Sequence, residues 1–197
     1  MPTPVGHTII GAAIGLGYAL PRGCAWRDMP AAAVRNWRML LAAVVASNLP
    51  DLDYLPGIFQ GAINAYHHLF THSIGWALLV ATGGWLCARG LKPELAPRMF
   101  VLLLVCLVAH LAADWLTDDG SPPYGIMAGW PWSDRYTISP VVIFPRVLKS
   151  TWSEVFQPYN LIVGGVEVLI TLPVLLMILA MKCFASGGDS APQHGEA

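Results

Sequence analysis

Residues Met99–Leu116 read MFVLLLVCLVAHLAADWL, a run that stays apolar until His110 and Asp114 near its end. An α-helix needs roughly 20 apolar residues to cross the ~30 Å hydrocarbon core of a bilayer. The run therefore predicts a transmembrane helix. His110 and Asp114 are four residues apart and so share one helical face. The predicted helix carries both polar groups at one end.

The rest of the chain is also unusually apolar. Of its 197 residues, 55% are hydrophobic and 12% are charged, with a net charge of -1 and a mean hydropathy of +0.55. Soluble domains usually contain about 25% charged residues, and a nearly neutral chain lacks the basic surface that nucleic acids require. These values exclude a soluble nucleic-acid-binding protein, and we expect no nucleic-acid partner.

The predicted fold is all-α: a polytopic helical membrane protein with about five transmembrane helices. The five predicted helices are Val5–Leu20, Met39–Leu55, Ser73–Ala88, Met99–Leu116 and Leu161–Phe184. Residues 117–160 are rich in Pro, Gly and aromatic residues and predict an interfacial loop, either a cap over helix ends or a platform beside a site. We expect residues 1–185 to form one membrane domain and the polar tail 186–197 to be disordered.

Basic residues orient the predicted bundle, because Lys and Arg accumulate in cytoplasmic loops. They lie between spans one and two, between spans three and four, and after span five: Arg22, Arg27, Arg35, Arg38, Arg89, Lys92, Arg98 and Lys182. The bias predicts an outer N-terminus and a cytoplasmic C-terminus. The long loop on the predicted outer side is an exception to this bias. Its basic residues are few and widely spaced: Arg135, Arg146 and Lys149.

Histidines and aspartates gather at the span ends assigned to the outer side. They are His7, Asp51, Asp53, His67, His68, His72, His110 and Asp114. At about 1.5 Å per helical residue, four spans bring such residues to one layer near the outer boundary. A charged side chain at mid-bilayer costs about 2.5–3.5 kcal/mol, which a metal ion or polar partners must offset. Imidazoles and carboxylates together predict a divalent metal site, with zinc favoured and Mn or Mg as alternatives.

Local spacing leaves some assignments open. Asp51 and Asp53 follow Pro50, where the chain leaves the helix, so both carboxylates can turn toward one centre. His68 and His72 share a face if HHLFTHS is helical, whereas His67 and His72 converge only if its first turn is irregular. The alternative for the whole set is a structural polar network, since a PDxD turn commonly caps or ends a helix and an HxxxD pair can hold two helices together.

The order of the motifs resembles that of a known family. The motifs are His7, SNLPDLDYL (Ser47–Leu55), HHLFTHS (His67–Ser73), HLAADWLTDDG (His110–Gly120) and GWPWSDRY (Gly129–Tyr136). Together they resemble the YdjM-like family of bacterial inner-membrane, metal-dependent hydrolases, over most of the chain up to about Phe144. More distantly, they are similar to zinc-dependent phospholipase C, a soluble helical enzyme that hydrolyses phosphoesters.

The resemblance implies that His7, Asp51, Asp53, His67, His72, His110 and Asp114 form the polar site, with Asp114 as a candidate bridging carboxylate. The chain departs from the pattern in two places. Where the family usually reads H-R-G-x-T-H-S, this chain has His68 and Leu69, so an anion-contacting Arg is absent or replaced by a pH-sensitive His. The later histidine and H-x-x-x-E of the phospholipase have no counterpart, which favours one or two metal ions over three.

We therefore expect a membrane-embedded hydrolase that cleaves a phosphoester, of a lipid or a lipid-linked substrate, with metal-activated water at the outer face of the bilayer. Asp51 or Asp53 would take the proton. Arg135 would stabilise the phosphate charge, unless it pairs with Asp134 or with lipid headgroups. Three further side chains are candidates to orient the histidines: Asn48, Thr71 and Ser73.

The alternative function is a non-enzymatic metal-binding module or a small transporter that uses the same cluster. It would need polar residues that continue along the span interiors, and the sequence offers few: Thr82, Glu167 and Thr171. Glu167 is an intramembrane carboxylate and therefore a functional candidate, which could join the cluster from span five.

Overall fold

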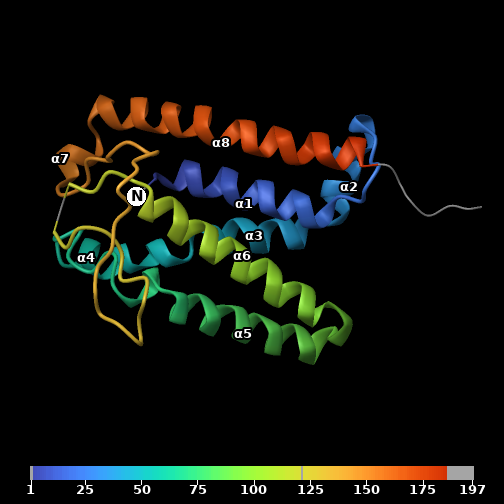
Figure 1. Ribbon diagram of the computed structural model, residues 1–197, viewed down its shortest axis with the longest axis horizontal. Helices are drawn as coiled ribbons and strands as arrows, with labels where there is room; N and C mark the ends of the chain where they lie inside the picture. Colours follow the sequence, from blue (N-terminus) through green and yellow to red (C-terminus); the bar gives the residue numbers. More distant parts are fainter. Residues whose placement is uncertain (1, 121, 186–197) are drawn as a thin grey trace, which may run out of the picture.

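The longest helices make up the body of the molecule (Figure 1). They are α1 (Pro4–Ala19), α3 (Trp37–Asn48), α5 (Ile74–Leu91), α6 (Ala96–Trp115) and α8 (Pro158–Phe184). The computed structural model describes residues 2–120 and 122–185, and every regular element within them is helical, as predicted. The tail 186–197, for which disorder is predicted, lies outside the described residues.

Shorter helices join or flank these five. They are η1 (Trp26–Asp28), α2 (Met29–Arg35), η2 (Pro50–Asp53), α4 (Tyr54–Phe59), η3 (Phe70–His72), η4 (Pro93–Leu95) and α7 (Trp152–Val155). Helices α4 and α7 lie with the long loop at the left-hand end of the molecule, and α2 lies at the opposite end (Figure 1). Residues 117–120 and 122–151 form loops and turns with two isolated β-bridges.

The prediction of five transmembrane helices is wrong in number. Within the described residues, three segments are long and apolar enough to cross a membrane: Ile74–Leu91, Pro93–Trp115 and Pro158–Phe184. Helix α1 has 16 residues and α3 has 12, which at 1.5 Å per residue give lengths of about 24 Å and 18 Å. Helix α3 stops at Asn48 because Pro50 starts the tighter 3-10 turn η2, where the span prediction had continued to Leu55.

Helix α1 lies at the centre of the bundle, packed against α3, α6 and α8, while α5 packs against α6. Glycines let α1 approach α3 closely. A Cβ on Gly11 would lie 2.9 Å from the backbone oxygen of Ala43, and one on Gly15 would lie 2.9 Å from the Ala43 Cβ. Small residues at such contacts allow the close helix packing that is common in membranes. The packing fixes the position of His7, one turn before Gly11.

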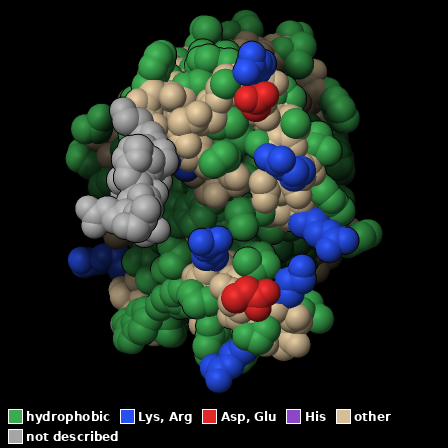
Figure 2. Space-filling view, turned by 90° about the vertical axis from the view of Figure 1, so that its right-hand side faces the viewer, with side chains coloured by type: hydrophobic (Ala, Val, Ile, Leu, Met, Phe, Trp, Pro, Cys, Tyr) green, Lys and Arg blue, Asp and Glu red, His purple; other side chains and the backbone are tan. Residues whose placement is uncertain are grey.

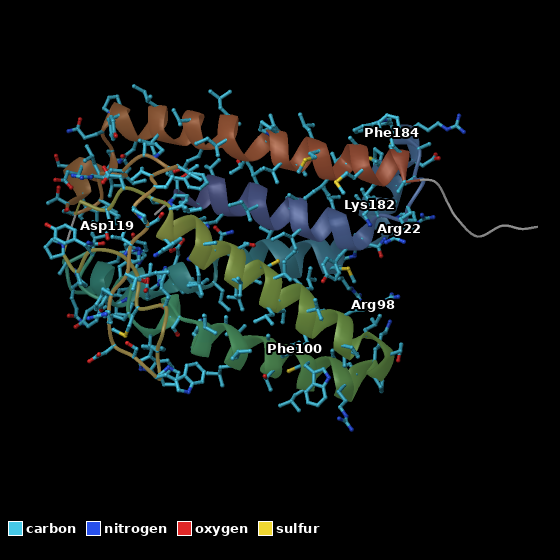
Figure 3. The ribbon with its side chains drawn as sticks, in the orientation of Figure 1. Arg22, Arg98, Phe100, Asp119, Lys182 and Phe184 are labelled. Carbon is cyan, nitrogen blue, oxygen red and sulfur yellow. The ribbon has the colours of Figure 1, made fainter. Side chains whose placement is uncertain are left out.

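The two ends of the bundle differ in charge. Arg22, Arg98 and Lys182 lie at one end, which we call the basic end, and Asp119 lies at the other (Figure 3). Viewed end-on, the basic end shows several Lys and Arg side chains and fewer acidic ones (Figure 2). The chain enters α6 at the basic end and leaves it at the other, so His110 and Asp114 lie at the end opposite Arg22, Arg98 and Lys182.

Candidate metal centre

Four separate segments bring polar side chains to the end of the bundle opposite the basic end. Helix α1 contributes His7, η2 contributes Asp51, η3 contributes His72, and α6 contributes His110 and Asp114. We call these five residues the central cluster. The three histidines are 0% exposed and Asp114 is 2% exposed. The sequence placed all five at one end, and the structure brings them into contact.

Asp114 contacts all three imidazoles of the central cluster. Its Oδ1 lies 3.2 Å from Nε2 of His7, and its Oδ2 lies 3.2 Å from Nε2 of His72 and 3.1 Å from Nε2 of His110. Asp51 reaches the same nitrogens at 3.4 Å (His72), 3.7 Å (His110) and 3.9 Å (His7). Ligands bound to one zinc ion at about 2.0–2.2 Å lie roughly 3–3.5 Å from each other. The shorter contacts of the cluster match this spacing.

The converging atoms lack hydrogen-bond partners. Nε2 of His7, His72 and His110 and both carboxylate oxygens of Asp51 and Asp114 are buried without one among the described residues. Buried polar atoms are nearly always satisfied, because leaving one unpaired costs about 1–3 kcal/mol. Three imidazole nitrogens and two carboxylates are a donor set that divalent cations bind. The central cluster therefore fits a metal ion.

Outer contacts turn two of the imidazoles toward the centre. Nδ1 of His110 lies 2.8 Å from the backbone oxygen of Ser47, to which it donates as an N–H. Nδ1 of His72 lies 3.1 Å from Oδ2 of Asp53. A proton on Nδ1 leaves the lone pair on Nε2, the atom that faces the cluster.

Asp53 lies outside the central cluster, although the sequence made it a candidate metal ligand and catalytic base beside Asp51. Its Oδ1 accepts from Nδ1 of His67 at 2.8 Å. Its Oδ2 accepts from the Thr71 hydroxyl at 2.7 Å and from the His68 backbone N–H at 3.1 Å, and also faces Nδ1 of His72. Both oxygens of the Asp53 carboxylate are engaged by these donors, so we infer that Asp53 orients the histidines.

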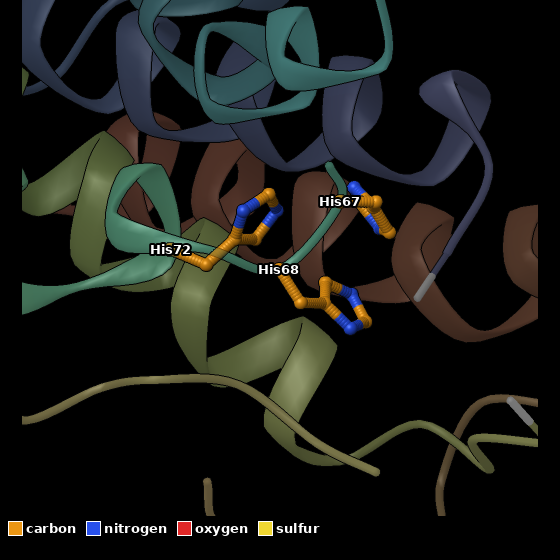
Figure 4. A group of neighbouring side chains, drawn as sticks. All are labelled: His67, His68 and His72. Carbon is orange, nitrogen blue, oxygen red and sulfur yellow. The ribbon is translucent and has the colours of Figure 1, made fainter. Parts of the chain in front are cut away.

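His67, His68 and His72 form a second group of potential ligands (Figure 4). One ligand atom from each lies within 4.8 Å of the others. His72 also contacts Asp51 and Asp114 of the central cluster. The sequence left His67 and His68 as alternatives, and the structure brings in both. His68 has a left-handed backbone with φ +65°, an irregular first turn that allows both rings to approach His72.

The buried rings of His67 and His68 are uncharged at neutral pH. Burial lowers the pKa of His68 to about 4 and holds that of His67 well below its usual value. Both imidazoles are therefore neutral, the form that binds metals. Their Nε2 atoms are buried and have no hydrogen-bond partner among the described residues.

Other candidates from the sequence lie around the site in different roles. Thr71 contacts Asp53, and Ser73 caps helix α5 by accepting from the Trp76 N–H at 3.1 Å. Asn48 donates to the Thr8 hydroxyl at 3.2 Å and so links α3 to α1. Arg135 is exposed, and none of the ion pairs found among the described residues joins it to the cluster.

Glu167 is buried in α8 and holds the start of α1 rather than the cluster. Its Oε1 accepts from the Thr3 N–H at 2.8 Å, and its Oε2 accepts from the Thr3 hydroxyl. The same hydroxyl caps α1 by accepting from the Val5 N–H at 3.3 Å. Glu167 therefore fixes the end of α1 that carries His7.

The sequence reasoning missed two residues beside the cluster, Lys149 and Asp119. The side chain of Asp119 is 7% exposed; its Oδ2 lies 3.6 Å from Nδ1 of His68 and accepts from the Gly125 N–H. Lys149 extends over the Tyr54 ring, 5.4 Å from its centre. The one sequence signal for Lys149 was a lysine after apolar residues on the side predicted to be poor in basic residues.

Comparison with known proteins extends to nearly the whole chain. The family described as YdjM inner membrane protein matches residues 1–187. No curated protein and no solved structure matches the chain.

Proposed function

Because the chain belongs to the YdjM inner membrane protein family, we propose that it acts within the bilayer as a metal-dependent hydrolase of phosphoesters. One observation carries the proposal: seven buried oxygen and nitrogen atoms from His7, Asp51, His72, His110 and Asp114 converge without hydrogen-bond partners among the described residues. A structural polar network would instead join these atoms by hydrogen bonds of normal geometry, which their contacts at 3.1–3.9 Å do not form.

The central cluster would hold one divalent cation, with Asp114 touching every histidine of the set. His67 and His68 would offer their unpaired Nε2 atoms to a second ion. We favour zinc, because imidazole nitrogen suits zinc better than it suits Mg or Mn. When bound, a divalent cation lowers the pKa of a water molecule and polarises a phosphoryl oxygen.

Asp51 is the residue placed to accept the proton of the attacking water. Both of its carboxylate oxygens lack a hydrogen-bond partner among the described residues, and it lines a cavity next to the cluster. Asp53 already accepts from His67, Thr71 and the His68 backbone. A general base needs a free lone pair within reach of the proton, so Asp51 fits this role and Asp53 does not.

The transport alternative has less support from the packing. A path for ions would have to continue from the cluster toward the basic end. Between α3 and α6, the side chains on that side are apolar and buried: Ala43, Ala46, Leu102 and Cys106. A dry apolar layer opposes the passage of a cation.

We also propose that the cluster faces the outer side of the membrane, because the basic end would then be cytoplasmic. A fusion of green fluorescent protein to the C-terminus should therefore fluoresce, and a fusion of alkaline phosphatase at the same point should be inactive. The opposite result in this pair of fusions would place the cluster at the cytoplasmic face.

Metal analysis coupled to a substrate screen tests the hydrolase. The purified full-length chain, loaded with zinc, should retain at least one ion per chain and hydrolyse a member of a panel of phosphomonoesters and phosphodiesters. Chelation should abolish the activity, and zinc should restore it. A chain that binds zinc, hydrolyses none of the panel and carries zinc into sealed vesicles would instead support the transport alternative.

A further inference from the structure

We propose that Lys149 and the apolar cavity beside the central cluster bind an amphiphilic phosphoester, with Lys149 holding the anionic head and the cavity holding an alkyl or acyl chain. The inference rests on the proposed function and adds the substrate class. It also assigns the contact with the phosphate to Lys149, where the sequence had suggested Arg135.

The cavity has a volume of about 520 Å³, within the usual range for small-molecule sites. Asp51, Tyr54 and Lys149 line it, so it borders both the central cluster and the lysine. Most of the remaining lining is apolar and includes Ile58, Ile63, Val147, Leu148 and Trp152. A polar reacting group and an apolar chain can therefore be held at the same time.

Lys149 is a cation for which no hydrogen bond or ion pair is found among the described residues. Its Nζ is shielded from solvent and has no hydrogen bond among the described residues. Lys182 at the basic end, by contrast, donates to the Leu20 oxygen at 2.9 Å, and Arg146 pairs with Asp118. A buried ammonium that lacks a hydrogen bond is costly, and an anionic phosphoryl group would supply the missing acceptors.

The position of Lys149 is fixed by the residue before it. Asn160, in the first turn of α8, accepts from the Leu148 N–H at 3.0 Å and donates to the Leu148 oxygen at 2.8 Å. The Lys149 ammonium also lies over the Tyr54 ring, which itself stacks on His67 with ring centres 3.9 Å apart. These contacts preorganise the lysine beside the histidines before a ligand binds.

The simpler explanation is that Lys149 only balances the negative charge of the nearby carboxylates. That role would affect stability and metal affinity, and it would leave the affinity for an anionic ligand unchanged in the metal-loaded protein. Ligand binding therefore separates the two explanations.

The test measures binding of octylphosphonate to the zinc-loaded full-length chain by calorimetry. The phosphonate carries a P–C bond, so the measurement does not depend on hydrolysis. Lys149→Met should weaken binding at least tenfold, because a charge-assisted hydrogen bond is lost, whereas Lys149→Arg should stay within about threefold of the wild type. Lys92→Met, at the exposed end of α5, is the matched control and should bind normally.

The proposal that the cavity holds the alkyl chain is tested with ethyl, butyl, hexyl and octyl phosphonates. Affinity should rise with each CH₂ group, up to about fourfold per group at full burial. Val147→Phe should fill the cavity and flatten this dependence. Val142→Phe, in the same loop but outside the cavity lining, should preserve it and so controls for uptake into detergent.

Unchanged octylphosphonate affinity in Lys149→Met would overturn the assignment of the head-binding residue. If that variant does not fold, Lys149→Gln provides the same test with a shorter neutral side chain. Equal chain-length dependence in Val147→Phe and the wild type would overturn the assignment of the cavity.

If phosphonate binding depends on Lys149 but no phosphoester is cleaved, the proposed binding site is supported and the proposed hydrolase activity is not. If a phosphoester is cleaved with an unchanged KM in Lys149→Met, the hydrolase stands and the role of Lys149 fails.

Discussion

Asp114→Ala is expected to empty the metal centre and to lower phosphoester hydrolysis by more than about 100-fold. Losing an outer partner of a metal ligand already costs 10- to 100-fold in metal affinity or activity, and Asp114 would be a ligand itself. Its carboxylate contacts Nε2 of His7, His72 and His110 at 3.1–3.2 Å. Its removal would also take away the carboxylate that holds the three buried imidazoles close together.

The measurement is zinc content per chain after zinc loading and gel filtration, followed by the rate with a substrate found in the screen. Asp118→Ala is the matched control, because Asp118 lies four residues beyond Asp114 and pairs with Arg146 in a partly exposed ion pair. It should keep both zinc and activity. A full complement of zinc in Asp114→Ala would show that the cluster is not the metal centre.

Asp51→Asn is expected to lower kcat by about 10²- to 10⁴-fold, the usual contribution of a general base, while much of the bound zinc is retained. The amide keeps one oxygen that can still face the cation but offers no carboxylate to accept a proton. The rate should therefore stay low even when zinc is in excess.

Asp53→Asn makes the contrasting variant. Asp53 orients His67 and His72 through their Nδ1 atoms, so the amide should weaken zinc binding by 10- to 100-fold. Excess zinc should then restore most of the rate. The roles assigned to the two aspartates would have to be exchanged if zinc rescued Asp51→Asn and failed to rescue Asp53→Asn.

Helix content and the end at which the polar residues gather could be predicted from the sequence, because both follow from hydropathy and from the positions of Arg and Lys. His110 and Asp114 share a helical face by their spacing alone. The number of spans could not be predicted in the same way. Hydropathy does not show that α3 ends at Asn48, since the residues after it, LPDLDYL, remain partly apolar although they pass through a 3-10 helix into α4.

Local spacing also could not separate Asp51 from Asp53. The two residues lie in one short 3-10 helix, and which of them faces the central cluster depends on contacts with η3 and α6. The rings of His67 and His68 can both approach His72 because His68 adopts a left-handed backbone. A helical wheel assumes regular helix geometry and therefore does not predict this arrangement. Lys149 reaches the site along a loop whose path is held by α8 through Asn160, a contact that sequence patterns do not encode.

The four donors on Asp53 have a thermodynamic consequence. His67, His72, Thr71 and the His68 backbone share one carboxylate, so neither ring can rotate without breaking a bond to the same group. The conformational entropy of aligning these rings is therefore lost when the chain folds, and little remains to be lost when a cation arrives. The rigidity of such a centre raises its affinity for the cation. The metal-free protein is correspondingly less stable, because its buried polar groups repel one another until the cation binds.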